Sequence, residues 1–114
     1  MVCLSHLSYS QEGNLPDNQK LAAQSENIDL VIGGNNRKVL SSAIIKRNKV
    51  KHEVVVTQAA WDGLMLGRTV YSFENGKQKT SVKAKNFIAG ETDGQDFIAS
   101  VKNLASLEKS RIAV

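Results

Sequence analysis

Two short apolar runs on either side of a helix-forming segment constrain this chain more than any other feature of its sequence. Val2–Ser5 is the first run and Ile28–Ile32 is the second. Short apolar runs bounded by polar or glycine residues are typical of buried strands. Between them, Pro16–Asp17 opens a segment of good helix formers from Asn18 to Glu26, and proline is tolerated in a first helical turn. The sequence therefore predicts a strand, a helix and a strand in that order.

A strand–helix–strand unit of this kind determines which loops come together. Such a crossover is right-handed in nearly all known proteins and makes its two strands parallel. The carboxyl ends of parallel strands lie at one edge of the sheet, where the binding loops of α/β proteins are found. We therefore expect Ser5–His6 and Gly33–Arg37 to lie together at that edge.

Past residue 40 the apolar pattern changes to the alternation of antiparallel strands. We expect a meander of three strands, formed by Glu53–Gln58, Leu66–Glu74 and Lys77–Phe87. The dipeptide Asn75-Gly76 is typical of a type I′ turn, which needs positive φ angles. The last strand carries lysines of a single parity, which are Lys77, Lys79, Lys83 and Lys85. They predict a solvated face or a protected sheet edge.

The last part of the chain predicts an amphipathic helix. Apolar side chains recur at helical spacing within Gln95–Arg111, and Thr92 with Gln95 fits a capping box. Residues 89–95 look like a linker. We therefore expect one domain, in which residues 1–88 form an α/β unit and residues 89–114 form a linker and a helix that belong to the same domain.

The composition narrows the classes of protein to which the chain can belong. A length of 114 residues allows one domain, and only six aromatic residues leave its core to aliphatic side chains. The single cysteine, Cys3, excludes an intrachain disulfide and a four-thiolate zinc site, and we expect it to be a small buried hydrophobic residue. No apolar run approaches the length of a membrane span, so we expect no membrane contact.

A basic run raises the question of nucleic-acid binding. The net charge is +4, and Lys46–His52 holds four basic residues and a histidine. Such a run can contact the phosphates of a nucleic acid. It has no aromatic side chain nearby on which a base could stack, so we interpret it as a solvated loop or short hairpin. We expect no nucleic-acid partner.

Three blocks of the chain resemble one known family. They are Val2–Leu7, Asn27–Gly34 and Gln58–Arg68. The first contains Ser-His-Leu, the second ends in Gly-Gly, and the third reads Gln-Ala-Ala-Trp-Asp-Gly-Leu-Met-Leu-Gly-Arg. In this order and spacing they resemble the second half of the phosphatase domain of the bacterial 5′-nucleotidases, which are calcineurin-like metallophosphoesterases. The resemblance runs from residue 2 to about residue 88.

The resemblance implies a fold and a chemistry. The fold would be α/β, a partial metallophosphoesterase-like sandwich with a parallel strand–helix–strand unit, an antiparallel meander and a C-terminal helix. The family hydrolyses phosphate monoesters of nucleotides with two divalent metal ions, which polarise the ester and activate a bridging water. The family has histidine ligands at the positions of His6, Asn35 and Arg37. His6 keeps the ligand, whereas Asn35 offers only an oxygen and Arg37 cannot ligate a metal.

The other metal ligands of the family lie in its N-terminal half, to which this chain has no counterpart. The resemblance therefore implies a truncated member, with His6 as the surviving metal ligand, no catalytic residue and no cofactor held by this chain alone. We expect the chain to be inactive as a hydrolase by itself. The family is commonly periplasmic or exported, but Met1–Ser5 is too short for a signal peptide and we expect none in this chain.

Each candidate residue also has a simpler structural interpretation. His6 would then be a polar residue hydrogen-bonded at a strand end, and the loop after the second strand would be an ordinary turn. In the functional interpretation this loop holds a phosphate or nucleotide anion through its backbone N–H groups and a guanidinium. The loop residues are Gly33, Gly34, Asn35, Asn36 and Arg37. As partners we expect a second copy of the chain, forming a homodimer, or a separately encoded N-terminal half.

Overall fold

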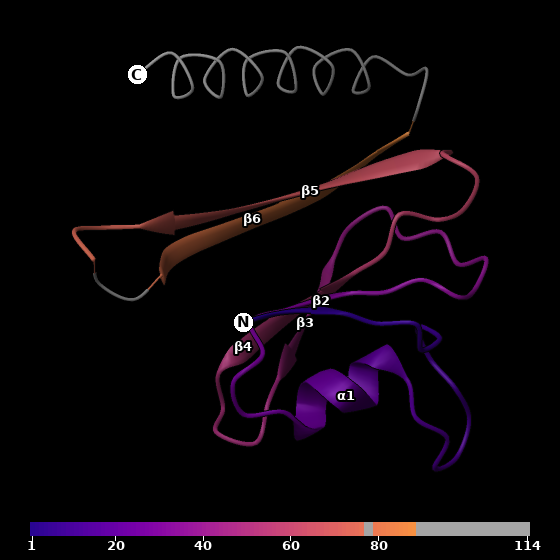
Figure 1. The fold of residues 1–114 in the computed structure, drawn as a ribbon, viewed down its shortest axis with the longest axis horizontal. Helices are drawn as coiled ribbons and strands as arrows, with labels where there is room; N and C mark the ends of the chain where they lie inside the picture. Colours follow the sequence, from indigo (N-terminus) through magenta and orange to yellow (C-terminus); the bar gives the residue numbers. More distant parts are fainter. Residues whose placement is uncertain (77–78, 89–114) are drawn as a thin grey trace.

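The computed structural model describes residues 1–76 and 79–88, which form one helix and six strands in two sheets (Figure 1). The elements are β1 (Val2–Leu4), α1 (Asn18–Gln24), β2 (Leu30–Ile32), β3 (Ile44–Arg47), β4 (Glu53–Thr57), β5 (Met65–Phe73) and β6 (Lys79–Ile88). The α/β fold class predicted from the sequence is confirmed. The predicted linker and C-terminal helix, residues 89–114, lie outside the described residues. Within the described ranges, no helix is long and apolar enough to cross a membrane.

The main sheet has four strands in the order β1-β2-β4-β3. Strands β1, β2 and β4 are parallel, with Cys3, Val31 and Val56 in one row, and β3 is antiparallel to β4. The chain passes from β1 through α1 to β2, which is the strand–helix–strand unit that the sequence predicts. The three parallel strands therefore end at a common edge of the sheet.

Helix α1 packs on one face of the main sheet and forms the core with it. Ala22 of the helix is buried in one cluster with Val31, Val54 and Val56 of the sheet. Burying a valine side chain contributes about 1.5–3 kcal/mol, so this cluster holds the helix to the sheet. Cys3 lies at the margin of the cluster and is half-buried rather than fully buried, because β1 is the outermost strand.

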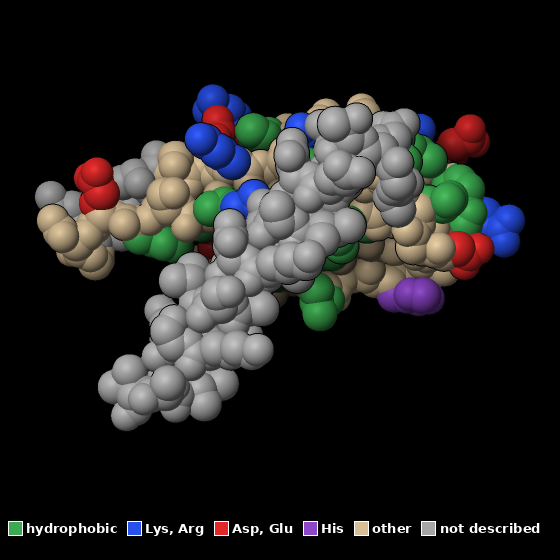
Figure 2. Space-filling model, turned by 90° about the horizontal axis from the view of Figure 1, so that it is seen from above, with side chains coloured by type: hydrophobic (Ala, Val, Ile, Leu, Met, Phe, Trp, Pro, Cys, Tyr) green, Lys and Arg blue, Asp and Glu red, His purple; other side chains and the backbone are tan. Residues whose placement is uncertain are grey.

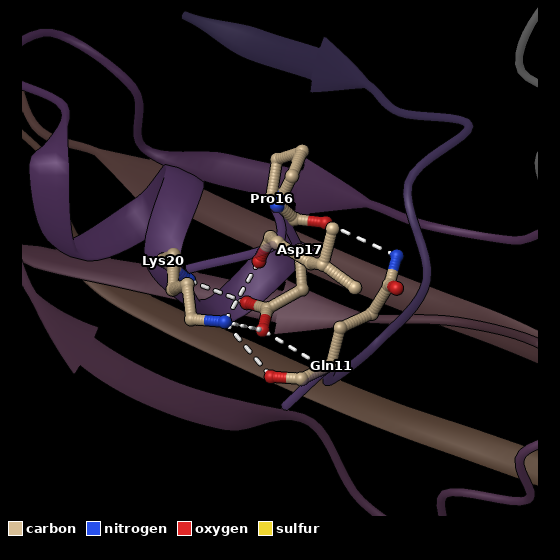
Figure 3. A network of polar contacts seen from close by, with 5 residues as sticks. Gln11, Pro16, Asp17 and Lys20 are labelled. Atoms are coloured by element: carbon tan, nitrogen blue, oxygen red, sulfur yellow. Dashed lines mark hydrogen bonds and ion pairs between the residues drawn. The ribbon is translucent and has the colours of Figure 1, made fainter. Parts of the chain in front are cut away.

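Asp17 begins α1 as its N-cap (Figure 3). Its carboxylate accepts hydrogen bonds from the backbone N–H groups of Lys20 at 2.7 Å and Gln11 at 2.9 Å, and the Lys20 ammonium lies 3.1 Å away. Burial raises the pKa of this carboxyl, but the hydrogen bonds and the Lys20 charge outweigh burial and bring the pKa below its ordinary value. Because Lys20 Nζ also donates to the carbonyl oxygens of Gln11 and Leu15, the network holds the preceding loop against the helix.

The second sheet is the hairpin of β5 and β6, which lies on the face of the main sheet opposite α1 (Figure 1). Two buried or half-buried side chains connect the sheets. Tyr71 OH donates to the carbonyl oxygen of Asp29 at 3.0 Å. Asn86 Nδ2 donates to the carbonyl oxygens of Leu40 at 2.7 Å and Gln58 at 3.2 Å. The main sheet is therefore the middle layer between α1 and the hairpin.

The predicted meander is wrong in the placement of its first strand. Glu53–Thr57 is β4 of the main sheet, where it pairs with β2 and β3 instead of β5. Its three consecutive valines are all buried, because one face of β4 packs on α1 and the other lies under the hairpin. A strand buried on both faces lacks the alternation of a meander strand. The basic run Lys46–His52 forms the end of β3 and the turn into β4, which agrees with its interpretation as a short hairpin.

The hairpin of β5 and β6 itself agrees with the sequence prediction. Asn75 and Gly76 have φ angles of 45° and 71°, the positive values that a type I′ turn requires. Along β6, exposed Lys83 alternates with half-buried Val82 and Ala84. The alternation predicted for this strand is therefore confirmed from residue 81 to residue 85, but Asn86 and Phe87, which follow, are both buried.

Candidate functional site

The carboxyl ends of β1, β2 and β4 lie side by side at one edge of the main sheet. Two backbone hydrogen bonds connect the chain just past these strands. Ser5 N–H donates to Ile32 O at 2.9 Å, and Gly33 N–H donates to Thr57 O at 2.8 Å. The structure thus brings the two predicted loops together. We call this region the strand-end site and define it as Ser5–Leu7, Gly33–Lys38, Thr57–Gln58 and Asn18.

Three residues of the strand-end site occupy positions at which the resemblance implies metal ligands. His6 follows β1, Asn35 and Arg37 follow β2, and all three side chains are exposed. Asn35 has a φ of 61°, so the loop turns at this residue. An imidazole and an amide oxygen can coordinate a cation, but a guanidinium offers only hydrogen-bond donors. Among the described residues, no three His, Cys, Asp or Glu side chains are grouped so that they could hold a metal ion.

Asn18 is a central residue of the strand-end site, although the sequence predicted only that it begins a helix. Its side chain is 1% exposed, and its Nδ2 donates to Leu7 O at 3.0 Å. The side chain lies against Gly33, where an added Cβ would overlap Nδ2 and come within 3.1 Å of Cγ. Gly33 therefore leaves room for a side chain from α1. The Gly-Gly pair was the only signal of this contact in the sequence.

Gln58 holds the loop after β2 from the neighbouring strand β4. It is 2% exposed, and its Nε2 donates to Asn36 Oδ1 at 2.9 Å and to Lys38 O at 2.7 Å. The third block of the resemblance begins at Gln58, but the sequence alone predicted no role for this glutamine. Its position directly after a buried strand, at the same edge as the other strand ends, was the signal that could have identified it.

Two buried side-chain oxygens of the strand-end site have no hydrogen-bond partner among the described residues. They are Asn18 Oδ1 and Gln58 Oε1. In both amides the nitrogen donates to a carbonyl oxygen, which determines the orientation of the amide. A buried acceptor without a partner costs about 1–3 kcal/mol. The described residues of the site therefore leave two buried acceptors unused.

The rim of the strand-end site is basic. Arg37 and Lys38 are exposed, and Lys38 Nζ lies 5.8 Å from the centre of the Tyr9 ring, within the range of a cation–π contact. The N–H of Gly33 already donates to Thr57, so it is not available to an anion. An anion at this loop would therefore depend on the Arg37 guanidinium and the loop residues beyond Gly33.

The charges are mixed on the face of the molecule that Figure 2 shows. In the view of Figure 2, the described Lys and Arg side chains lie in separate groups with Asp and Glu beside them. A nucleic-acid backbone is usually met by a stripe or patch of basic side chains on one face. The described side chains in this view form no such stripe. The absence of a nucleic-acid partner stays a prediction.

Comparison with known proteins identifies a similar fold. No protein-family model matches the sequence, and no curated protein matches it significantly. Among solved structures, the chain is similar to the 5′-nucleotidase precursor from Thermus thermophilus, with a TM-score of 0.57 at 20% sequence identity over 83% of this chain. The chain spans 21% of the length of that protein.

This likeness is one of fold. It covers most of this chain, which consists of the parallel sheet, the crossover helix and the antiparallel hairpin in its described part. It agrees with the architecture that the sequence resemblance implies. The chain therefore has an α/β fold similar to part of a 5′-nucleotidase structure.

Proposed function

We propose that this chain is a 5′-nucleotidase-like metallophosphoesterase segment that does not hydrolyse phosphate esters by itself. The observation that carries the proposal is the strand-end site, where His6, Asn35 and Arg37 share the edge at which the resemblance implies metal ligands. The fold likeness to part of a 5′-nucleotidase supports the first half of the proposal. The chemistry of Arg37 supports the second half.

Dimetal hydrolysis requires side chains that hold two cations close together around a bridging water. A guanidinium stays protonated at all relevant pH values, so Arg37 would repel a cation at this position. His6 is the one imidazole of the strand-end site as the structure describes it. Since the chain spans 21% of its solved neighbour, the remaining ligands would come from other polypeptide. Hydrolysis would then require the N-terminal half of the phosphatase domain.

The direct test is an assay of the purified full chain with a nucleoside monophosphate and with an aryl phosphate. The assay is run with Mn²⁺, Zn²⁺ and Mg²⁺ in turn, and we expect no turnover above the buffer. His6→Ala is the matched variant, because it removes the surviving family ligand from an exposed position without touching the core. Metal-dependent turnover that His6→Ala abolishes would show that the chain is a complete enzyme.

A second variant tests whether the two substituted family positions lie close enough to share a metal ion. Asn35→His with Arg37→His restores imidazoles at the two family positions. We expect this double variant to bind Zn²⁺ more tightly than the wild-type chain in a calorimetric titration, because imidazole is a preferred zinc ligand. We expect it to remain without turnover. An unchanged Zn²⁺ affinity would show that these positions do not converge on a common site.

A second candidate function is anion binding by the loop after β2, through Arg37 and the loop residues beyond Gly33. The observation that favours it is the pair of exposed cationic side chains, Arg37 and Lys38, next to a backbone turn at Asn35. A guanidinium binds phosphate through paired hydrogen bonds. The ligand would be inorganic phosphate or the phosphate of a nucleotide.

Thermal unfolding in phosphate tests this candidate. A ligand that binds only the folded state stabilises it by RT ln(1 + [L]/Kd), which is about 2.7 kcal/mol at a hundredfold excess over Kd. We expect Arg37→Ala to remove this gain. Arg47→Ala is the matched control, because Arg47 is an exposed arginine outside the strand-end site. A melting temperature of the wild-type chain that phosphate leaves unchanged would exclude the anion site.

A further inference from the structure

Strand β1 is an edge of the main sheet. Among the strands that the structure describes, it pairs with β2 alone. Edge strands usually avoid pairing with another chain by carrying charges, prolines or bulges. The opposite edge strand β3 carries Lys46 and Arg47, whereas β1 reads Val-Cys-Leu and pairs in regular register. The two edges therefore differ in how readily they can accept another strand.

Beside this edge the main sheet has an uncovered apolar surface. Val2 and Leu4 share a face with Leu30, which is buried under the hairpin. Val2 is nevertheless 58% exposed and Leu4 is 80% exposed, because the hairpin covers the central strands but not β1. Ile32, in register with Leu4, is also exposed. We call Val2, Leu4 and Ile32 the β1 strip.

An open groove continues the β1 strip beyond the amino end of β1. Its volume is about 650 Å³, and its lining includes Val2, Asp29 and Phe73. Phe73 is a further exposed apolar side chain on the groove wall. Because Val2 belongs to both the strip and the groove, the two form one surface along the free edge.

We propose that a second copy of this chain pairs with β1, antiparallel to it, around a twofold axis at Cys3. In this register Val2 of one copy opposes Leu4 of the other, and the two Cys3 residues oppose each other. Directly opposed residues of antiparallel strands lie on the same face. The two β1 strips therefore meet on one face, the two Cys3 side chains meet on the other, and the two main sheets become continuous.

A second copy fits this edge because a twofold contact needs a surface that is complementary to itself. β1 has no charged side chain, so two identical strands meet without like-charge repulsion. Each strip also needs the apolar cover that the other supplies. The Met1 ammonium at the amino end of β1 forms an ion pair with Asp29, so this end brings no unpaired charge into the contact.

Sedimentation equilibrium of the full chain over a range of concentrations tests the proposal. We expect a species of about twice 12.4 kDa that dissociates on dilution. Val2→Lys should weaken the dimer at least about tenfold, because it places an ammonium group opposite the partner's Leu4. A dimer whose affinity Val2→Lys leaves unchanged, or a wild-type chain that is monomeric at every concentration, overturns the proposal.

Ile45→Lys is the matched control for Val2→Lys. Ile45 lies in the same row of the sheet as Val2, on the same face and 56% exposed, but at the β3 edge. We expect it to leave the dimer affinity within about twofold of wild type, and circular dichroism to show that both variants fold. Equal weakening by the two variants would overturn β1 as the interface.

Oxidation tests the register independently of affinity. Diamide takes up the two electrons and two protons of two opposed thiols as they form a disulfide, so the wild-type chain should give a covalent dimer at Cys3. Cys3→Ser should give none, and Val2→Lys should slow the reaction about in proportion to its loss of dimer. A dimer that diamide does not crosslink would overturn the register. These readouts do not depend on hydrolysis, so their outcome is separate from that of the proposed function.

Discussion

Replacing Gly33 by alanine is a sharp test of how the strand-end site is packed, because Gly34 beside it provides a matched control. An alanine Cβ at Gly33 would overlap Asn18 Nδ2 and lie 3.1 Å from Cγ. A Cβ at Gly34 would have no atom within 4 Å. Neither glycine has a positive φ, so backbone strain does not distinguish the two substitutions.

The expected cost follows from the position of Asn18. Because Asn18 is 1% exposed, its side chain has no open space to enter and must give up its 3.0 Å hydrogen bond to Leu7 O. Leaving such buried groups without a partner costs about 1–3 kcal/mol. Alanine also lowers the conformational entropy of the unfolded chain, which raises the free energy of unfolding by about 0.4–1 kcal/mol. Gly33→Ala should therefore lower the free energy of unfolding by up to about 2.6 kcal/mol, whereas Gly34→Ala should leave it unchanged or raise it by up to about 1 kcal/mol.

Urea unfolding followed by circular dichroism measures both values, provided that the slope with urea stays constant. The double variant with Asn18→Ala completes a cycle that isolates the contact. In the Asn18→Ala background, Gly33→Ala should cost little, because the overlapping amide is gone. Two results would show that Asn18 does not occupy this space. In one, Gly33→Ala is as stable as Gly34→Ala. In the other, the costs of Gly33→Ala and Asn18→Ala add in the double variant.

Three further predictions concern the helix cap and the contacts between the sheets. The pKa of Asp17 in the folded protein is lowered from its ordinary 3.8, so the ionised carboxylate stabilises the folded state above that pH. This stabilisation is lost as the pH falls through the folded-state pKa. Asp17→Asn should therefore reduce the dependence of the free energy of unfolding on pH in the acid range. Asn86→Ala should lower the free energy of unfolding by about 2–4 kcal/mol in urea melts, because the carbonyl oxygens of Leu40 and Gln58 lose their donor. Burial and the Asp29 charge raise the pKa of Tyr71 above 10.0, so the component of an ultraviolet titration that Tyr71→Phe removes should have its midpoint above that pH. A titration that Tyr71→Phe leaves unchanged would contradict this assignment.

The local elements of the fold were accessible from the sequence because short-range chemistry determines them. Asp17 caps α1 through its own backbone neighbours, and Asn75-Gly76 adopts the positive φ angles of its turn without help from distant residues. The order of strand, helix and strand followed in the same way from two apolar runs. These features depend on contacts within a few residues, so one sequence is enough to predict them.

Part of the candidate site could be predicted from the sequence. The carboxyl ends of parallel strands must share an edge, so His6 and the loop containing Arg37 could be placed together. Asn18 and Gln58 could not be found in this way. Their side chains cross between elements that are far apart in sequence, and an asparagine or glutamine in the sequence carries no mark of the carbonyl oxygen that it will bind.

The sequence by itself determined the α/β class, the crossover unit, the turn of the hairpin and the chemical types of residue at the strand ends. The tertiary structure decided that β4 joins the parallel sheet, because three consecutive valines are equally compatible with several partners until α1 and the hairpin cover both faces. It also decided which apolar residues stay uncovered. Val2 and Val55 are both valines in strands and lie in one row, but Val55 is 2% exposed and Val2 is 58% exposed. The difference arises because burial depends on how far the hairpin reaches across the sheet, which is a property of the packed layers and not of either residue.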